Sequence, residues 1–188
     1  AVASFVITFI LTLVFCFEEE GTTEKVDSSE NVEAGSHDTK KVYSPVQGKV
    51  VPLEKVNDSA FSEKLMGEGI AILPESNQIV SPFDGTVAAV FPTKHAIGLV
   101  SDTGIEVLIH VGIDTVQLNG QYFESLVESG DRVKKGQPIL TVDFDKVKEA
   151  GYDIVTPIIV TNTSEYVAVV AKDEMTEATP ENAIIYVI

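Results

Sequence analysis

Turn-forming residues recur every 8 to 15 positions between Val42 and the C-terminus, and short β-branched runs fill the intervals. Runs such as Thr86–Val90 and Ile139–Val142 have the length of strands and are bounded by turn residues. The turn positions are Pro45/Gly48, Gly67/Gly69, Pro82/Gly85, Asp102/Gly104, Asn119/Gly120, Gly130/Asp131, Gly136/Pro138 and Pro157. Strands at this spacing predict an all-β fold for residues 42–188, an antiparallel β-sandwich or barrel with short helices.

Helical patterns within this domain are short, and a glycine follows each of them closely. They cover Ser59–Met66, Tyr122–Glu128 and Asp145–Ala150. One internal echo supports a layered β fold, since Ser44–Val50 matches Ser81–Val87 at Ser, Pro, Gly and Val. We expect two similar tight turns, each leading into a strand and packing symmetrically. Two copies are too few for a solenoid.

Two segments of very different composition precede the domain. Residues 1–17 carry no charge, glycine or proline, and as a helix they would span roughly 26 Å, close to the roughly 30 Å of a bilayer core. They predict the end of a transmembrane helix that begins upstream; the alternative, a secretory signal peptide, lacks its basic region. Residues 18–41 hold eight acids, three bases and no aromatic side chain, which predicts an acidic flexible linker.

The charge balance excludes some classes of partner. Acidic residues number 29 against 13 basic ones, a formal net charge of −16, which argues against binding to nucleic acid. The one cysteine, Cys16, permits neither an intramolecular disulfide nor a cysteine-based zinc cluster. The sequence contains no phosphate-binding loop of the G-x-x-x-x-G-K-[ST] type.

Candidate chemistry rests on the two histidines of the domain, His95 and His110. Strand alternation in residues 106–111 places Val107, Ile109 and Val111 in the core, and it turns Leu108 and His110 outward. The same alternation places Phe91, Thr93 and His95 on one face. A turn after His110 brings Asp114 close to its ring. We therefore expect an apolar platform around two outward-facing imidazoles, although each histidine taken alone favours a structural role at the surface or half-buried.

The segment around His110 resembles the active-site segment of a known family. EVLIHVGIDTVQLNG (106–120), SPFDGTV (81–87), TKHA (93–96), GEGIA (67–71) and GDRVKKG (130–136) are similar to the glucose-type (type 1) EIIA domains of the bacterial phosphoenolpyruvate:sugar phosphotransferase system. The resemblance runs from about Tyr43 to the end of the chain. With the linker and apolar segment before it, the arrangement is most similar to β-glucoside-type EIIBCA permeases.

The resemblance implies a phosphotransferase with a phosphohistidine intermediate. His110 is then the residue that accepts a phosphoryl group from the carrier HPr and passes it to a cysteine of the EIIB domain, which phosphorylates the sugar. His95 hydrogen-bonds the phosphoryl group, and Thr93 orients His95. No cofactor and no metal are implied. The EIIB and EIIC domains belong to the same chain, at the cell membrane, with the EIIA domain on the cytoplasmic side and a β-glucoside as the expected sugar.

A carrier of this kind needs a small docking surface that is apolar at its centre and charged at its rim. Asp58 and Asp114 are the expected rim carboxylates, facing a basic partner. The expected apolar patch, exposed around the histidines, comprises Phe61, Leu65, Met66, Phe91 and Leu108.

Three other interpretations compete with the phosphocarrier. A zinc hydrolase could use His95, His110 and Asp114, but such enzymes usually have three protein ligands plus a catalytic base, often with an H-x-H pair, and the sequence offers no such arrangement. A biotinyl or lipoyl carrier is suggested by residues 130–136, but it needs a lysine at a hairpin tip, which Lys49 and Lys94 do not provide. A regulatory binding module without phosphoryl transfer is the third alternative.

Overall fold

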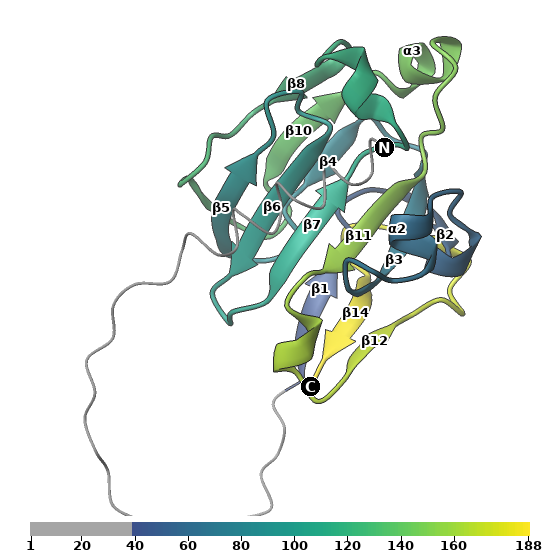
Figure 1. Ribbon diagram of the computed structural model, residues 1–188. Coiled ribbons are helices and arrows are strands. Elements are labelled where there is room, and N and C mark those ends of the chain that lie inside the picture. Colours follow the sequence, from purple (N-terminus) through teal and green to yellow (C-terminus); the bar gives the residue numbers. More distant parts are fainter. Residues whose placement is uncertain (1–38) are drawn as a thin grey trace, which may run out of the picture. The chain divides into compact units, whose positions relative to one another are not determined.

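The structure is a computed structural model that describes residues 39–188 (Figure 1). The apolar segment 1–17 and nearly all of the expected linker 18–41 lie outside the described residues, so both stay predictions. Lys40 and Lys41, which we expected in the linker, form part of the first strand because Lys40 pairs with Val187 near the C-terminus. Among residues 39–188, no helix combines the length and apolarity that spanning a membrane requires.

Short strands dominate the described chain, as the turn spacing predicts. They are β1 (Lys40–Tyr43), β2 (Gly48–Val51), β3 (Glu68–Pro74), β4 (Gln78–Val80), β5 (Gly85–Val90), β6 (Ala96–Ser101), β7 (Glu106–His110), β8 (Phe123–Ser125), β9 (Arg132–Val133), β10 (Pro138–Val142), β11 (Thr156–Val160), β12 (Val169–Ala171), β13 (Glu177–Ala178) and β14 (Ala183–Val187). The helices are η1 (Leu53–Lys55), α2 (Ser59–Ser62), η2 (Thr115–Leu118), α3 (Phe144–Glu149) and η3 (Thr163–Glu165).

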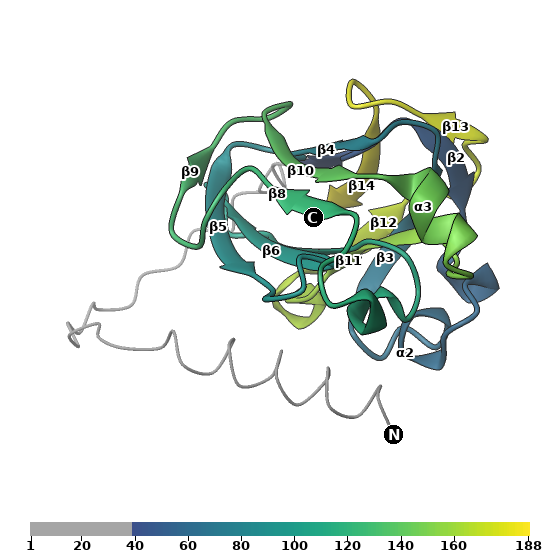
Figure 2. The ribbon, with the colours of Figure 1, turned by 90° about the horizontal axis from the view of Figure 1, so that it is seen from above.

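The strands form three antiparallel sheets. The largest has the order β13-β2-β3-β11-β7-β6-β5-β9, and the smaller ones have the orders β1-β14-β12 and β4-β10-β8. Seen from above, β4 and β10 lie across from β6 and β11, which gives the layered arrangement of a sandwich (Figure 2). The all-β antiparallel fold class is therefore confirmed.

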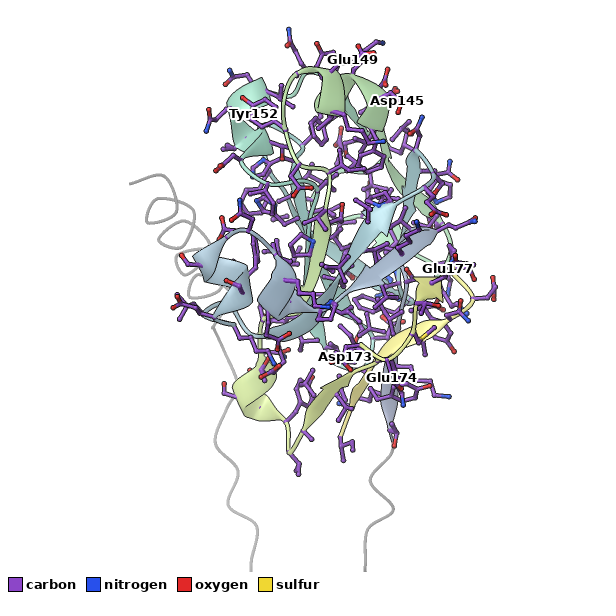
Figure 3. The ribbon with its side chains drawn as sticks, turned by 90° about the vertical axis from the view of Figure 1, so that its right-hand side faces the viewer. Asp145, Glu149, Tyr152, Asp173, Glu174 and Glu177 are labelled. Atoms are coloured by element: carbon purple, nitrogen blue, oxygen red, sulfur yellow. The ribbon has the colours of Figure 1, made fainter. Side chains whose placement is uncertain are left out.

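The core lies between these layers and follows strand alternation. Ile109 of β7 pairs with Ile97 of β6 and Ile158 of β11, and all three side chains are buried in the central hydrophobic cluster. Acidic side chains lie on the outside. Figure 3 shows Asp145 and Glu149 at the end that carries α3, and Asp173 at the other end, beside the β1-β14-β12 sheet. This separation explains how an acidic chain still builds a continuous apolar core.

The two echoed turns, Ser44–Gly48 and Ser81–Gly85, have the same hydrogen bonds. In each, the serine hydroxyl donates to the carbonyl two residues ahead, over 2.6 and 2.7 Å. The turns also bond each other reciprocally, through Tyr43 N–H to Pro82 O and Val80 N–H to Pro45 O. The symmetric packing expected from the sequence is thus confirmed.

Two of the three expected helices differ from the structure. The helix expected over Ser59–Met66 is only the single turn α2, because the backbone turns left-handed at Lys64 with φ of 56°. The segment Tyr122–Glu128 is not helical: Phe123–Ser125 forms β8 and pairs with β10, a long-range contact that overrides local preference. Only the third expected helix is confirmed, as α3, which Asp143 caps.

Candidate functional site

His110 ends strand β7, and its ring is held by the turn that follows. Its Nδ1 lies 2.8 Å from the carbonyl oxygen of Gly112. Because a carbonyl only accepts, this contact places the ring proton on Nδ1 and leaves the lone pair on Nε2. Within residues 39–188 no hydrogen bond engages Nε2 of His110, and the residue retains 7% exposure. The site therefore offers one imidazole nitrogen as a nucleophile.

His95 lies in the turn between β5 and β6 and meets His110 edge to face. The ring centroids are 5.0 Å apart, with an interplanar angle of 80°. Thr93 Oγ1 is 2.5 Å from Nδ1 of His95, so the expected pairing of hydroxyl and ring is present. Among buried side-chain nitrogen and oxygen atoms of the described residues, Nε2 of His95 alone has no hydrogen-bond partner. Buried polar atoms without a partner are rare in folded proteins, so Nε2 of His95 marks a candidate functional position.

Both histidines are buried, which corrects the outward orientation expected from strand alternation. His95 lies in a turn rather than on a strand face, and it is only 2% exposed because its ring packs against those of Phe91 and His110. Leu108 and His110 do lie on the second face of β7, but α2 and the β5–β6 turn cover that face. Figure 1 shows α2 in front of β3 and β11. The Phe61 ring centroid is 5.1 Å from that of His110.

Burial also sets the charge of the two rings. Desolvation, reinforced by the neighbouring His110, lowers the pKa of His95 to about 3. Desolvation lowers the pKa of His110 too, against the hydrogen bond to Gly112 and the opposing charges of Asp58 and Asp114. Both imidazoles are therefore neutral near pH 7, the state in which Nε2 of His110 is nucleophilic.

The expected apolar patch is only partly exposed. Phe61, Phe91 and Leu108 are buried, at 4%, 9% and 4% exposure, so they do not form an open surface, and the two phenylalanine rings pack against the imidazoles instead. The ring of Phe91 packs edge-on against His95, at 5.6 Å between centroids. Leu65 is exposed at 64% and Met66 is half-buried; both line an open groove beside α2.

The two expected rim carboxylates flank His110 from different elements. Asp58 caps α2, where its Oδ1 accepts from Ala60 N–H over 2.8 Å. Asp114 is exposed and has a left-handed backbone with φ of 58° just before η2. Both carboxylates act on His110 electrostatically, as the effect on its pKa shows.

Sequence reasoning missed the groups that hold His110 in place. The carbonyl of Gly112 and the hydroxyl of Thr115 were not among the expected site residues. In the sequence, the only signal for Gly112 and Thr115 was the run of turn residues after His110. Among residues 39–188, no cluster of three or more His, Cys, Asp or Glu side chains has a geometry suited to a metal ion.

Fold and site together define an all-β domain built around a pair of neutral imidazoles, one of which presents a free nitrogen. Residues 40–166 match the family described as phosphoenolpyruvate-dependent sugar phosphotransferase system, EIIA 1. The chain belongs to this family.

Relatives and a solved structure agree with this assignment. The chain is 45% identical over 170 residues, 90% of its length, to the "PTS system glucose-specific EIICBA component" of Staphylococcus saprophyticus. It is 50% identical over 125 residues, 66% of its length, to the "PTS system beta-glucoside-specific EIIBCA component" of Bacillus subtilis. It spans only 25% and 20% of these relatives. The solved glucose permease IIA from Mycoplasma capricolum superimposes with a TM-score of 0.74 at 36% identity, over 80% of this chain and 96% of that one.

The assignment establishes the general activity. The domain is an EIIA component of sugar transport and takes part in phosphoryl relay as part of a phosphotransferase system. The two relatives are named for different sugars, so membership in the family does not select a β-glucoside over glucose.

Proposed function

We propose that Nε2 of His110 accepts a phosphoryl group from phosphorylated HPr and passes it to a cysteine of an EIIB domain. The observation that carries this proposal is the bond from Nδ1 of His110 to the Gly112 carbonyl, because it makes Nε2 the attacking nitrogen. In the first step the N–P bond of the carrier's phosphohistidine breaks as the Nε2–P bond of His110 forms. In the second step that bond breaks and an S–P bond forms on cysteine. His110 keeps its Nδ1 proton throughout.

His95 is proposed to bind the phosphoryl oxygens. If the Thr93 hydroxyl donates to Nδ1 of His95, the ring proton lies on Nε2, the atom that has no partner in the structure. A phosphoryl oxygen on His110 would accept from it. Because the pKa of His95 is low, this donor is neutral, and it stabilises the group without an ion pair too strong for onward transfer. Phosphoryl transfer depends mostly on such alignment and electrostatic stabilisation.

The apolar walls are proposed to protect the phosphohistidine from water. Phe61 packs on His110 and Phe91 on His95, so hydrophobic rings occupy the sides of the two imidazoles. A site closed on these sides favours transfer to a docked partner over hydrolysis.

Docking of HPr and EIIB is proposed to occur on the surface around the two imidazoles. Leu65 and Met66 supply the accessible apolar contacts, whereas Phe61, Phe91 and Leu108 are buried and would act by shaping the site rather than by touching the partner. Asp58 and Asp114 lie at the rim, where they would meet a basic carrier. A partly apolar centre with charged edges suits two short-lived complexes that use the same surface.

The rest of the assembly is proposed from the relatives. Their names join EIIA to EIIB and EIIC in one chain, and we infer the same partners here, with the domain tethered on the cytoplasmic side of the cell membrane. A flexible linker of the expected length, residues 18–41, would keep His110 at an effective concentration on the order of millimolar at an EIIB site. A β-glucoside stays the expected sugar and glucose the alternative.

Intact-protein mass spectrometry tests the proposal most directly. The chain and its His110→Ala variant are incubated with phosphoenolpyruvate, enzyme I and HPr. We expect one acid-labile phosphoryl group on the wild type and none on the variant. No addition to the wild type, with HPr itself phosphorylated, would contradict the proposed transfer.

A further inference from the structure

The turn after β7 contains a buried hydroxyl that the proposed transfer does not use. Thr115 is fully buried, and its Oγ1 donates to the carbonyl oxygen of Val111 over 2.6 Å. Val111 immediately follows His110. This hydroxyl therefore acts on the backbone that carries the reactive ring.

Val111 is also held by His95, through the peptide on the other side of its Cα. The N–H of Val111 donates to the carbonyl of His95 over 2.7 Å. The C=O of Val111 accepts from Thr115. With both polar groups bonded, the two peptides on either side of residue 111 are fixed, and the second of them leads directly into Gly112, whose carbonyl meets His110.

Packing around Gly112 leaves little room for another orientation. Gly112 has φ of +75°, and a Cβ placed there would lie 2.5 Å from the methyl carbon of Thr115 and 2.7 Å from the carbonyl oxygen of Asp153. The N–H of Ile113 donates to that same carbonyl over 2.9 Å. Thr115 therefore contacts this turn in two ways: its hydroxyl bonds the carbonyl just before Gly112, and its methyl packs against the Cα of Gly112.

We propose that Thr115 is a positioning residue that directs the Gly112 carbonyl at Nδ1 of His110 and so keeps the reactive lone pair on Nε2. This inference rests on the proposed function of His110, which it deepens. Without the hydroxyl, the Val111 carbonyl loses its buried partner and the turn relaxes. The Gly112 carbonyl then holds Nδ1–H less firmly, and the Nε2–H tautomer, which cannot attack, gains population.

The test compares three variants of the 188-residue chain. Thr115→Val keeps the shape and removes the hydroxyl, whereas Thr115→Ser keeps the hydroxyl and removes the methyl. Thr156→Val is the matched control: Thr156 is also fully buried and its hydroxyl bonds a backbone carbonyl, that of Ile154, which is not part of the His110 turn. Nitrogen-15 NMR of the unphosphorylated imidazole reports the tautomer of His110, and rapid quench reports phosphoryl acceptance from phospho-HPr.

We expect Thr115→Val to show a mixture of tautomers and an acceptance rate about tenfold lower, the size of effect that losing one buried hydrogen-bond partner produces. Thr115→Ser should keep the wild-type tautomer, and Thr156→Val should match the wild type in both measurements. A wild-type tautomer in Thr115→Val, or an equal shift in Thr156→Val, would overturn the proposal. If Thr115→Val does not fold, Thr115→Ala replaces it, with the same outcomes.

The tautomer is measured without any phosphoryl donor. Failure of the wild type to accept a phosphoryl group would therefore count against the proposed function, whereas an unchanged tautomer counts against Thr115 alone.

Discussion

The backbone N–H of Val111 donates to the carbonyl of His95 over 2.7 Å, which joins the end of β7 to the turn before β6. This bond ties the chain on both sides of the site together, so the two imidazoles keep their edge-to-face contact with centroids 5.0 Å apart. The pair behaves as one unit of fixed geometry, and this has consequences that can be measured.

Replacing His95 with glutamine should separate acceptance from onward transfer. Gln is neutral and can donate a hydrogen bond, but it lacks the ring that Thr93 orients against His110. We expect acceptance from phospho-HPr at a slow or normal rate and delivery to the EIIB cysteine lowered by about a hundredfold. Quenched-flow measurement of each half-reaction tests this, and normal delivery would refute the role of His95.

Folding stability should fall as the pH drops below about 6.5. His95 has an ordinary pKa of 6.5 when unfolded and about 3 in the structure, so between these values the unfolded chain binds a proton that the folded chain excludes. The loss approaches about 1.4 kcal/mol per pH unit for this histidine. Urea unfolding across this range measures it. The pH dependence should be weaker in His95→Gln, and an unchanged slope would contradict this assignment.

Gly112→Ala should destabilise the domain strongly. A Cβ at this position would clash with Thr115 and with the Asp153 carbonyl and would sit at positive φ. We expect a loss of about 3 kcal/mol in the free energy of unfolding, measured with denaturant.

Gly136→Ala is the matched control for this glycine. Gly136 also has positive φ, 78°, but a Cβ there meets nothing within 4 Å. Gly136→Ala should lower the free energy of unfolding by about 1 kcal/mol, from backbone strain alone. Equal costs at the two glycines would mean that the turn after His110 is not tightly packed.

Phe61→Ala and Leu65→Ala should affect different properties. Phe61 is buried against His110, so truncation should cost about 3 kcal/mol of stability and speed hydrolysis of the phosphohistidine. Leu65 is 64% exposed, so truncation should leave stability within about 0.5 kcal/mol and weaken docking of phospho-HPr. Denaturant unfolding and the KM for phospho-HPr separate the two effects. An unchanged KM for Leu65→Ala would remove this residue from the docking surface.

Removal of residues 1–38 should leave a folded domain that still accepts a phosphoryl group. β1 begins at Lys40 and pairs with β14, so this boundary keeps the sheet complete. A shorter chain beginning at residue 44 should be markedly less stable, because it lacks β1. Circular dichroism melts of both fragments test the boundary, and equal stability would mean that β1 contributes little.

Much of the fold could be predicted from local sequence. The turn residues located most strands, and the two Ser-Pro-x-x-Gly segments correctly predicted paired turns. One error came from a long-range contact and one from a local turn of the backbone. Tyr122–Glu128 has a helical pattern but forms β8 because β10 lies beside it. The left-handed backbone at Lys64 shortened the expected helix to α2.

By itself the sequence determined the class of fold, the two histidines and the motif around His110, because turn chemistry and residue identity are local properties. Only the tertiary structure decided that Leu108 and His110 are buried, since alternation shows which face of a strand a side chain occupies but not what covers that face. It also decided that Nδ1 of His110 meets the Gly112 carbonyl and that Nε2 of His95 has no partner among residues 39–188. Those relationships depend on backbone orientation and on packing between segments far apart in the chain, and they set which nitrogen can react.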